Sequence, residues 1–137
     1  MRGWITDPAG EAGLRLVADL PEPEPEANEA VIAVKAFSLN RGELGLISRR
    51  PDGFRPGQDI AGVVVNAAAD GSDPPEGARG VSAVDWHGWA ERASTPVELM
   101  APLPANVSFA QAAWAAPLLP CSSAHRILCD RGPAVSC

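Results

Sequence analysis

Short apolar runs separated by turn-forming residues extend from the N-terminus to about residue 107, and they set the fold class. Residues 1–5 and 14–20 alternate apolar and polar side chains, which is the period of a half-buried strand. Residues 30–37 are almost continuously apolar, which predicts a strand buried on both faces. Gly, Pro, Asn and Asp lie between the runs. The chain is therefore predicted to be mainly β, a partly open barrel or a sandwich with short helices.

Two segments have helical features. Ser108 is a suitable N-cap for a helix over residues 109–116, and Gln111 completes a capping box, so a C-terminal helix should lead out of the barrel. Residues 41–47 place Leu44 and Ile47 at helical spacing, which favours a helix. The glycines in that segment limit the expectation to one short helical turn.

The size and net charge of the chain limit which classes of partner are expected. A chain of 137 residues can form one domain with a hydrophobic core, and its 11 basic against 17 acidic residues give a net charge of −6. Without a basic stripe, a nucleic-acid partner is not expected. Neither a targeting segment nor a membrane span is expected, because no window approaches the roughly 18 apolar residues that a span needs. The cysteines, Cys121, Cys129 and Cys137, form no disulfide framework, which favours a cytoplasmic location.

The segment 56–64, Pro-Gly-Gln-Asp-Ile-Ala-Gly-Val-Val, runs from a turn through two polar residues into an apolar strand. This order places Gln58 and Asp59 at the mouth of a small barrel. The segment resembles the Gly-His-Glu-x-x-Gly motif of the medium-chain dehydrogenase/reductase superfamily. In the alcohol dehydrogenases of that family the His binds catalytic zinc. Here Gln58 stands in place of that His, and Asp59 in place of the Glu.

Other segments resemble the N-terminal, GroES-like domain of the same superfamily. Residues 36–44 are similar to the segment that carries a zinc-binding Cys in alcohol dehydrogenases, and Asn40 matches the quinone-reductase-like branch. Residues 77–81 resemble its Gly-Asp-Arg-Val turn, 87–91 its Gly-Gly-Phe-Ala-Glu segment, and 103–113 its exit from the barrel. Together with 56–64 they occur in the family's order, so residues 1–116 are identified as a GroES-like substrate domain.

The resemblance implies a zinc-independent oxidoreductase. The barrel has no Cys before residue 121, and Gln58 is a poor zinc ligand, so no metal is expected. The family's quinone and enoyl reductases pass a hydride from NADPH to a quinone or a carbonyl-conjugated alkene. The implied partner is such a small molecule, and a homodimer is expected only if the full enzyme is made.

Four residues are candidates for the pocket, and no catalytic residue is assigned. Asn40 either donates to a substrate oxygen or ribose hydroxyl, or ends the strand with an Asx-turn. Gln58 either faces the substrate or satisfies backbone groups at the barrel mouth. Trp86 either walls the pocket or is a core or rim aromatic. His87 has no metal-ligand partner at suitable spacing and is interpreted as a loop residue.

Asp59 is the fourth candidate, and its expected role is structural. A carboxylate at the start of a buried strand needs a partner. The chain offers two arginines, Arg41 and Arg79, at positions that could supply one. An ion pair between Asp59 and one of them is therefore expected.

Residues 117–137 contain no glycine-rich turn and are too few for a Rossmann βαβ unit, so this tail should form no independent domain. A shifted frame through residues 120–126 can encode Pro-Ala-Ala-Ala-Leu-Thr-Ala, which resembles the helix by which the family enters its cofactor domain. The expectation is a truncated or frameshifted chain, inactive as an isolated fragment.

A metal site from the three cysteines and His125 lacks paired close spacing. A stand-alone barrel used for binding or assembly, and a decayed gene, are the alternatives.

Overall fold

The structure is a computed structural model that describes residues 1–10 and 12–115. The expectations for the tail 117–137, its cysteines and His125 lie outside the described residues. The elements are β1 (Gly3–Thr6), β2 (Leu14–Val17), β3 (Glu29–Phe37), α1 (Arg41–Ile47), β4 (Asp59–Asn66), β5 (Arg79–Ala83), β6 (Arg92–Pro96), the 3-10 turn η1 (Val97–Leu99), β7 (Met100–Pro102) and α2 (Phe109–Ala115).

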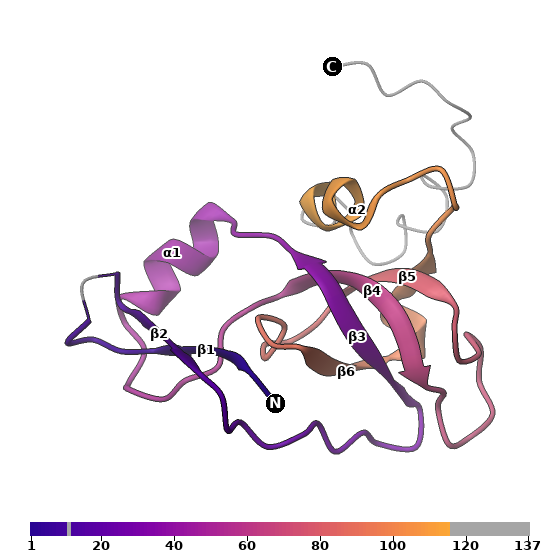
Figure 1. Ribbon diagram of the computed structural model, residues 1–137, viewed down its shortest axis with the longest axis horizontal. Coiled ribbons are helices and arrows are strands. Elements are labelled where there is room, and N and C mark those ends of the chain that lie inside the picture. Colours follow the sequence, from indigo (N-terminus) through magenta and orange to yellow (C-terminus); the bar gives the residue numbers. More distant parts are fainter. Residues whose placement is uncertain (11, 116–137) are drawn as a thin grey trace.

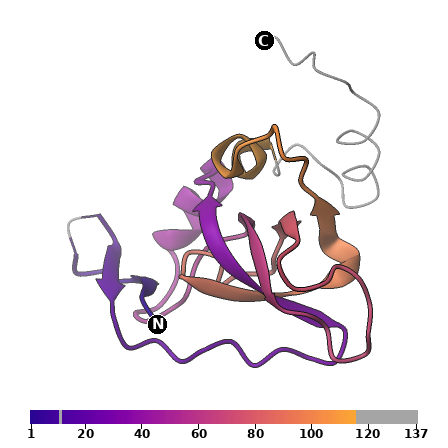
Figure 2. The ribbon, with the colours of Figure 1, turned by 45° about the vertical axis from the view of Figure 1, so that its right-hand side comes forward.

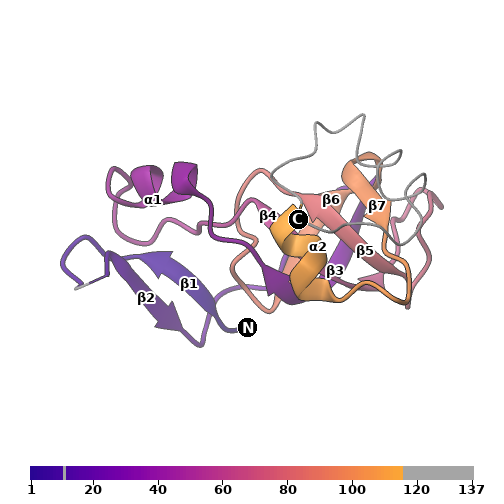
Figure 3. The same ribbon diagram turned by 90° about the horizontal axis from the view of Figure 1, so that it is seen from above.

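A five-stranded antiparallel sheet, in the order β6-β3-β4-β5-β7, forms the body of the molecule (Figure 1). It curls into a half-barrel, which is evident when the molecule is turned by 45° (Figure 2). The β1–β2 hairpin forms a separate two-stranded sheet. It lies with α1 at one end of the molecule, away from α2 (Figure 3). The predicted mainly β class and partly open barrel are confirmed.

The core has two layers because neighbouring strand residues point to opposite faces of the sheet. On one face Ala61 packs with Val81, Leu103 and the small residues Ala112 and Ala113 of α2. On the other face lies a second set of side chains: Ile32, Ile60, Val84 and Ala93. Consecutive residues at the start of β4 thus serve both layers, as the apolar run in the sequence predicts.

The strand β3 is buried on both faces only in its first half. Ala30, Val31 and Ile32 are buried, whereas Phe37 is 42% exposed. The expectation of a strand buried throughout is therefore wrong for its C-terminal half. The change follows a register shift between Val34 and Ala36, after which the strand runs to the edge of the body.

The two helices differ in how far the sequence predicts them. For α2 the expected capping box is confirmed: the Gln111 N–H donates to Ser108 Oγ (3.3 Å) and Ser108 N–H to Gln111 Oε1 (3.0 Å). For α1 a helix forms as expected, but Glu43 and Ile47 are its buried residues, while Leu44 is 54% exposed. The helix thus turns Glu43 rather than Leu44 toward the interior, and the polar contacts of Glu43 explain this orientation. No helix in the described part of the chain has the length and hydrophobicity to cross a membrane.

Candidate functional site

The end of β3, the start of α1 and the start of β4 meet at one corner of the domain. Asn40 is the N-cap of α1: its Oδ1 accepts the N–H of Glu43 at 2.9 Å. In return, Glu43 Oε2 accepts the Asn40 N–H at 3.0 Å, which completes a capping box. The local, strand-ending role considered for Asn40 is therefore present, in the form of a helix cap.

The carboxylate of Glu43 joins two segments that are distant in the sequence. Its second oxygen, Oε1, accepts the N–H of Gln58 at 2.9 Å, just before β4 begins. Glu43 is fully buried, and no cationic side chain lies within 4.0 Å of its carboxylate among the described residues. Burial raises the pKa of Glu43 above its ordinary value. The two backbone hydrogen bonds oppose this rise, and the negative charge of Asp59 adds to it.

The free energy of unfolding should therefore depend on pH through Glu43. A raised pKa means that the folded chain binds the proton more tightly than the unfolded chain, whose Glu titrates near ~4.3. The stabilisation by the protonated group is complete below that value and is lost as the pH rises through the folded-state pKa. Relative to Glu43→Gln, the wild-type free energy of unfolding should fall across this window, by at most about 1.4 kcal/mol per pH unit.

Urea denaturation of both chains at closely spaced values from about pH 4 to pH 7 measures this difference. Subtracting the Glu43→Gln curve removes the contributions of Asp70 and Glu91, whose pKa values are lowered by hydrogen bonds. A difference that stays flat across the range would contradict the raised pKa.

Asp59 completes the polar corner through neutral donors. Its Oδ2 accepts from Ser38 Oγ at 3.0 Å and from Asn40 Nδ2 at 3.3 Å. In the described part of the chain it forms no ion pair, so the expected pairing with Arg41 or Arg79 is wrong. Arg79 instead donates to the carbonyls of Pro104 and Val107, each at 2.7 Å. Asp59 needs no cation because two adjacent side chains satisfy one of its oxygens.

Gln58 differs from its neighbours because its side chain remains available. Its backbone is fully used: the N–H donates to Glu43 and the carbonyl accepts from Val84 N–H at 2.6 Å. The side chain is half-buried and makes no hydrogen bond within the described residues. A fixed backbone thus presents an amide whose donor and acceptor are not used by any residue that the structure describes.

Gly57 and Trp89 pack against each other behind this corner and support it. Gly57 has φ of 109°, and a Cβ there would lie 2.4 Å from the backbone nitrogen of Trp89, so only glycine fits. The indole of Trp89 is 3% exposed, its Nε1–H donates to Ser38 O at 3.0 Å, and its ring stacks on Phe37 at 5.4 Å. The segment 87–91, identified in the sequence by its resemblance to the family's Gly-Gly-Phe-Ala-Glu segment, therefore supports the site through Trp89.

Trp86 belongs to a different cluster. Its ring meets Phe54 edge-on at 5.2 Å, and the guanidinium of Arg50 lies 5.1 Å from its centroid. The structure thus brings together Asn40, Asp59 and the backbone of Gln58, while Trp86 packs on the loop that precedes them.

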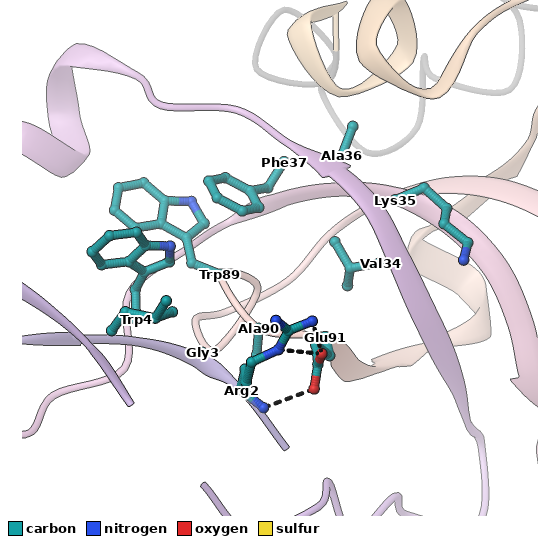
Figure 4. A pocket seen from close by; sticks show the side chains of 11 residues that line it. Arg2, Gly3, Trp4, Val34, Lys35, Ala36, Phe37, Trp89, Ala90 and Glu91 are labelled. Carbon is teal, nitrogen blue, oxygen red and sulfur yellow. Dashed lines mark hydrogen bonds and ion pairs between the residues drawn. The ribbon is translucent and has the colours of Figure 1, made fainter. Parts of the chain in front are cut away.

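An open groove of about 450 Å³ lies beside this corner, between β1, β2, β3 and the segment 89–91. Figure 4 shows the rings of Trp4, Phe37 and Trp89 gathered at one end and the Arg2–Glu91 ion pair, 2.7 Å, at the other. None of the four predicted pocket residues lines it. The groove and the corner share Trp89, whose indole N–H bonds to Ser38 behind Asn40.

The donor chemistry at the corner does not suit a metal. Asn40, Gln58 and Asp59 offer one carboxylate and two amides, and that carboxylate already accepts two hydrogen bonds. Within residues 1–10 and 12–115 no three His, Cys, Asp or Glu side chains gather where they could hold an ion.

Sequence reasoning missed Glu43 and Trp89 as parts of the site. A signal for Glu43 was present, because Asn-x-x-Glu at residues 40–43 has the form of a capping box. The buried position of Trp89 has no comparable local signal, because its partners Phe37 and Ser38 come from another strand.

The curled sheet, the helix leading out and the corner between β3 and β4 define a GroES-like domain. No family model matches the chain. A trans-enoyl reductase of Pyricularia oryzae is 32% identical over 113 residues, 74% of this chain and 31% of that protein. The crystal structure of the human synaptic vesicle membrane protein VAT-1 homolog-like protein has a TM-score of 0.75 and 31% identity, covering 82% of this chain and 38% of that one.

The quinone oxidoreductase of Thermus thermophilus is 34% identical with a TM-score of 0.66, and covers 82% of this chain and 36% of its own. The chain belongs to the quinone-oxidoreductase-like branch of the medium-chain dehydrogenase/reductase superfamily. It spans less than a third of the length of the curated relative described above.

Proposed function

We propose that this chain forms the substrate side of a zinc-independent, NADPH-dependent reductase that acts on a quinone or a carbonyl-conjugated alkene. The names of the trans-enoyl reductase and the quinone oxidoreductase support this substrate class, and the latter was also crystallised with NADPH. The observation that carries the proposal is the side-chain amide of Gln58, which makes no hydrogen bond to the described residues and stands on a backbone fixed by Glu43 and Val84.

The role of Gln58 follows from the charge that the reaction develops. Hydride addition to a quinone or an enone moves negative charge onto the carbonyl oxygen. A donor fixed near that oxygen stabilises the charge where no metal polarises the carbonyl. The Nδ2–H of Asn40 already donates to Asp59 and its Oδ1 caps α1, so Asn40 orders the corner while Gln58 faces the substrate.

The proposed reductase needs no zinc because Gln58, an amide, stands at the position of the family's metal ligand, and Asn40 adds a second amide beside it. NADPH, when bound, supplies the hydride. The described residues contain no βαβ unit for its pyrophosphate, so in this proposal a separate domain holds most of the cofactor. The isolated chain should therefore bind substrate weakly and show no NADPH oxidation.

Titration of the isotopically labelled chain with 2,3-dimethyl-1,4-naphthoquinone tests this role. The probe is neutral, and its substituted quinone ring does not add thiols. The side-chain amide resonance of Gln58 should shift on binding. Gln58→Ala should weaken binding by about threefold to tenfold, as expected for one hydrogen bond. The matched control is Asn66→Ala, which removes an exposed amide at the other end of β4 and should leave binding unchanged.

Equal affinities of wild type and Gln58→Ala for the quinone would contradict the proposal that the Gln58 side chain binds the substrate. NADPH oxidation by the isolated chain would overturn its proposed inactivity. A large symmetric oligomer by native mass, without quinone binding, would instead favour a barrel used in assembly.

A further inference from the structure

The segment 41–55 concentrates positive charge in a chain whose net charge is −6. It holds four arginines: Arg41, Arg49, Arg50 and Arg55. Arginine ion pairs in the described part of the chain involve Arg2, Arg15 and Arg92 instead. The segment also contains Glu43 and Asp52, but none of its four arginines forms an ion pair with a carboxylate among the described residues.

The guanidinium of Arg50 lies over two aromatic rings. The carbon of its guanidinium lies 4.5 Å from the ring centroid of Phe54 and 5.1 Å from that of Trp86, within the range of cation–π attraction. The Nε atom is buried and has no hydrogen-bond partner among residues 1–10 and 12–115. A guanidinium fixed in this way loses little rotational freedom when an anion binds to its remaining donors.

Arg55 adds a second cation beside this cluster. It is half-buried, and its Nε is also buried without a hydrogen-bond partner in the described part of the chain. Burial lowers its pKa. Its carbonyl accepts the N–H of His87 at 3.2 Å. The pKa of His87 is lowered first by burial and then by the positive charge of Arg55, so that charge acts across the cluster.

The cluster is rigid on both sides. Phe54 N–H donates to Thr6 Oγ1 at 2.9 Å, and Thr6 N–H donates to Phe54 O at 2.8 Å, which fixes the loop to β1. Trp86 and His87 have φ of 149° and 70°, a strained pair for residues other than glycine. Backbone strain of this kind is concentrated at ligand sites.

We propose that Arg50 and Arg55 bind an acidic group of the substrate, while Phe54 and Trp86 contact its conjugated ring system. The ligand class is then a planar aromatic or conjugated carbonyl compound that carries a carboxylate, sulfonate or phosphate. In naming this ligand as the substrate, the inference rests on the proposed function. The link is that Arg55 and Gln58 lie in one segment, and both bond through their carbonyls to the loop 84–87.

Anthraquinone-2-sulfonate and anthraquinone-2-sulfonamide provide the test, because they share a ring system and differ in charge. At low salt the sulfonate should bind at least about tenfold more tightly, and added salt should reduce this ratio. The indole N–H resonance of Trp86 should shift with the sulfonate. Arg50→Gln and Arg55→Gln should each weaken sulfonate binding by about fivefold or more and leave sulfonamide binding unchanged.

Two further variants distinguish a specific anion site from a general effect of positive charge on binding. Arg92→Gln removes the same charge from β6, where Arg92 pairs with Glu22, and should leave the sulfonate affinity within about twofold of wild type. Arg50→Lys keeps the charge without the planar fork and should bind with an intermediate affinity. Thermal unfolding of each variant shows whether it is folded.

Equal binding of the two probes, or equal losses in Arg50→Gln and Arg92→Gln, would overturn the anion site. The dimethylnaphthoquinone titration distinguishes this failure from that of the proposed function. If the neutral quinone shifts Gln58 while the sulfonate has no advantage, only the anion site fails. If the sulfonate depends on Arg50 while Gln58 does not respond to the neutral quinone, the anion site stands and the reductase role fails.

Discussion

Gly62→Ala is expected to lower the free energy of unfolding by about 3 kcal/mol or more. A Cβ at this position in β4 would lie 2.2 Å from the carbonyl oxygen of Ala33 and 2.7 Å from Ile32 Cγ2. The first of these is a backbone atom of the paired strand β3, so no change of rotamer can relieve the contact. The sheet would have to open at its centre. Urea denaturation, followed by circular dichroism, measures the loss.

Gly45→Ala is the matched control because nothing lies within 4 Å of the Cβ it would add. Gly45 is inside α1, where alanine is the better helix former, so this variant should gain up to about 1 kcal/mol. If Gly62→Ala unfolded at the same urea concentration as wild type, the close approach of β3 and β4 at this point would be wrong.

Trp89→Ala should cost about 3 to 5 kcal/mol, the range for removing a large buried aromatic side chain. The indole fills the space behind the polar corner, stacks on Phe37 and donates to Ser38 O. Trp89→Phe keeps most of the packing and loses the hydrogen bond, so its loss should be smaller and include about 1 kcal/mol for that bond. Calorimetric unfolding measures both without relying on tryptophan fluorescence.

The same truncation at Trp114 is the control for Trp89. Trp114 is 67% exposed on α2, and Trp114→Ala should change the free energy of unfolding by less than about 0.5 kcal/mol. Equal losses at the two positions would contradict the buried role of Trp89.

The strands and the cap of α2 could be predicted because their signals are local. Alternation along residues 1–5 and 14–20, and the pair Ser108–Gln111, are visible within a few positions. The family motifs then supplied the barrel. The orientation of α1 could not be predicted in this way: its buried face is chosen by Glu43, whose second partner, the N–H of Gln58, lies on another segment.

The hydrogen-bond partners of the polar side chains could not be predicted either, because they too depend on contacts between distant segments. An arginine for Asp59 was a reasonable expectation from charge, but Ser38 and Asn40 satisfy the carboxylate through the folded shape of the corner. The Arg50–Phe54–Trp86 cluster joins two loops that are distant in the sequence, and Trp86 has a positive φ of 149°. Neither the long-range contact nor this backbone conformation has a signature in the local sequence.

Among the described residues, the carboxylate of Glu43 accepts hydrogen bonds only from main-chain N–H groups, those of Asn40 and Gln58. It therefore fixes where residue 58 stands without restricting which side chain stands there. Position 58 can exchange its side chain while β4 keeps its path, so a substitution there should carry little cost in folding. The corner thus separates a fixed backbone frame from a side chain that is free to vary.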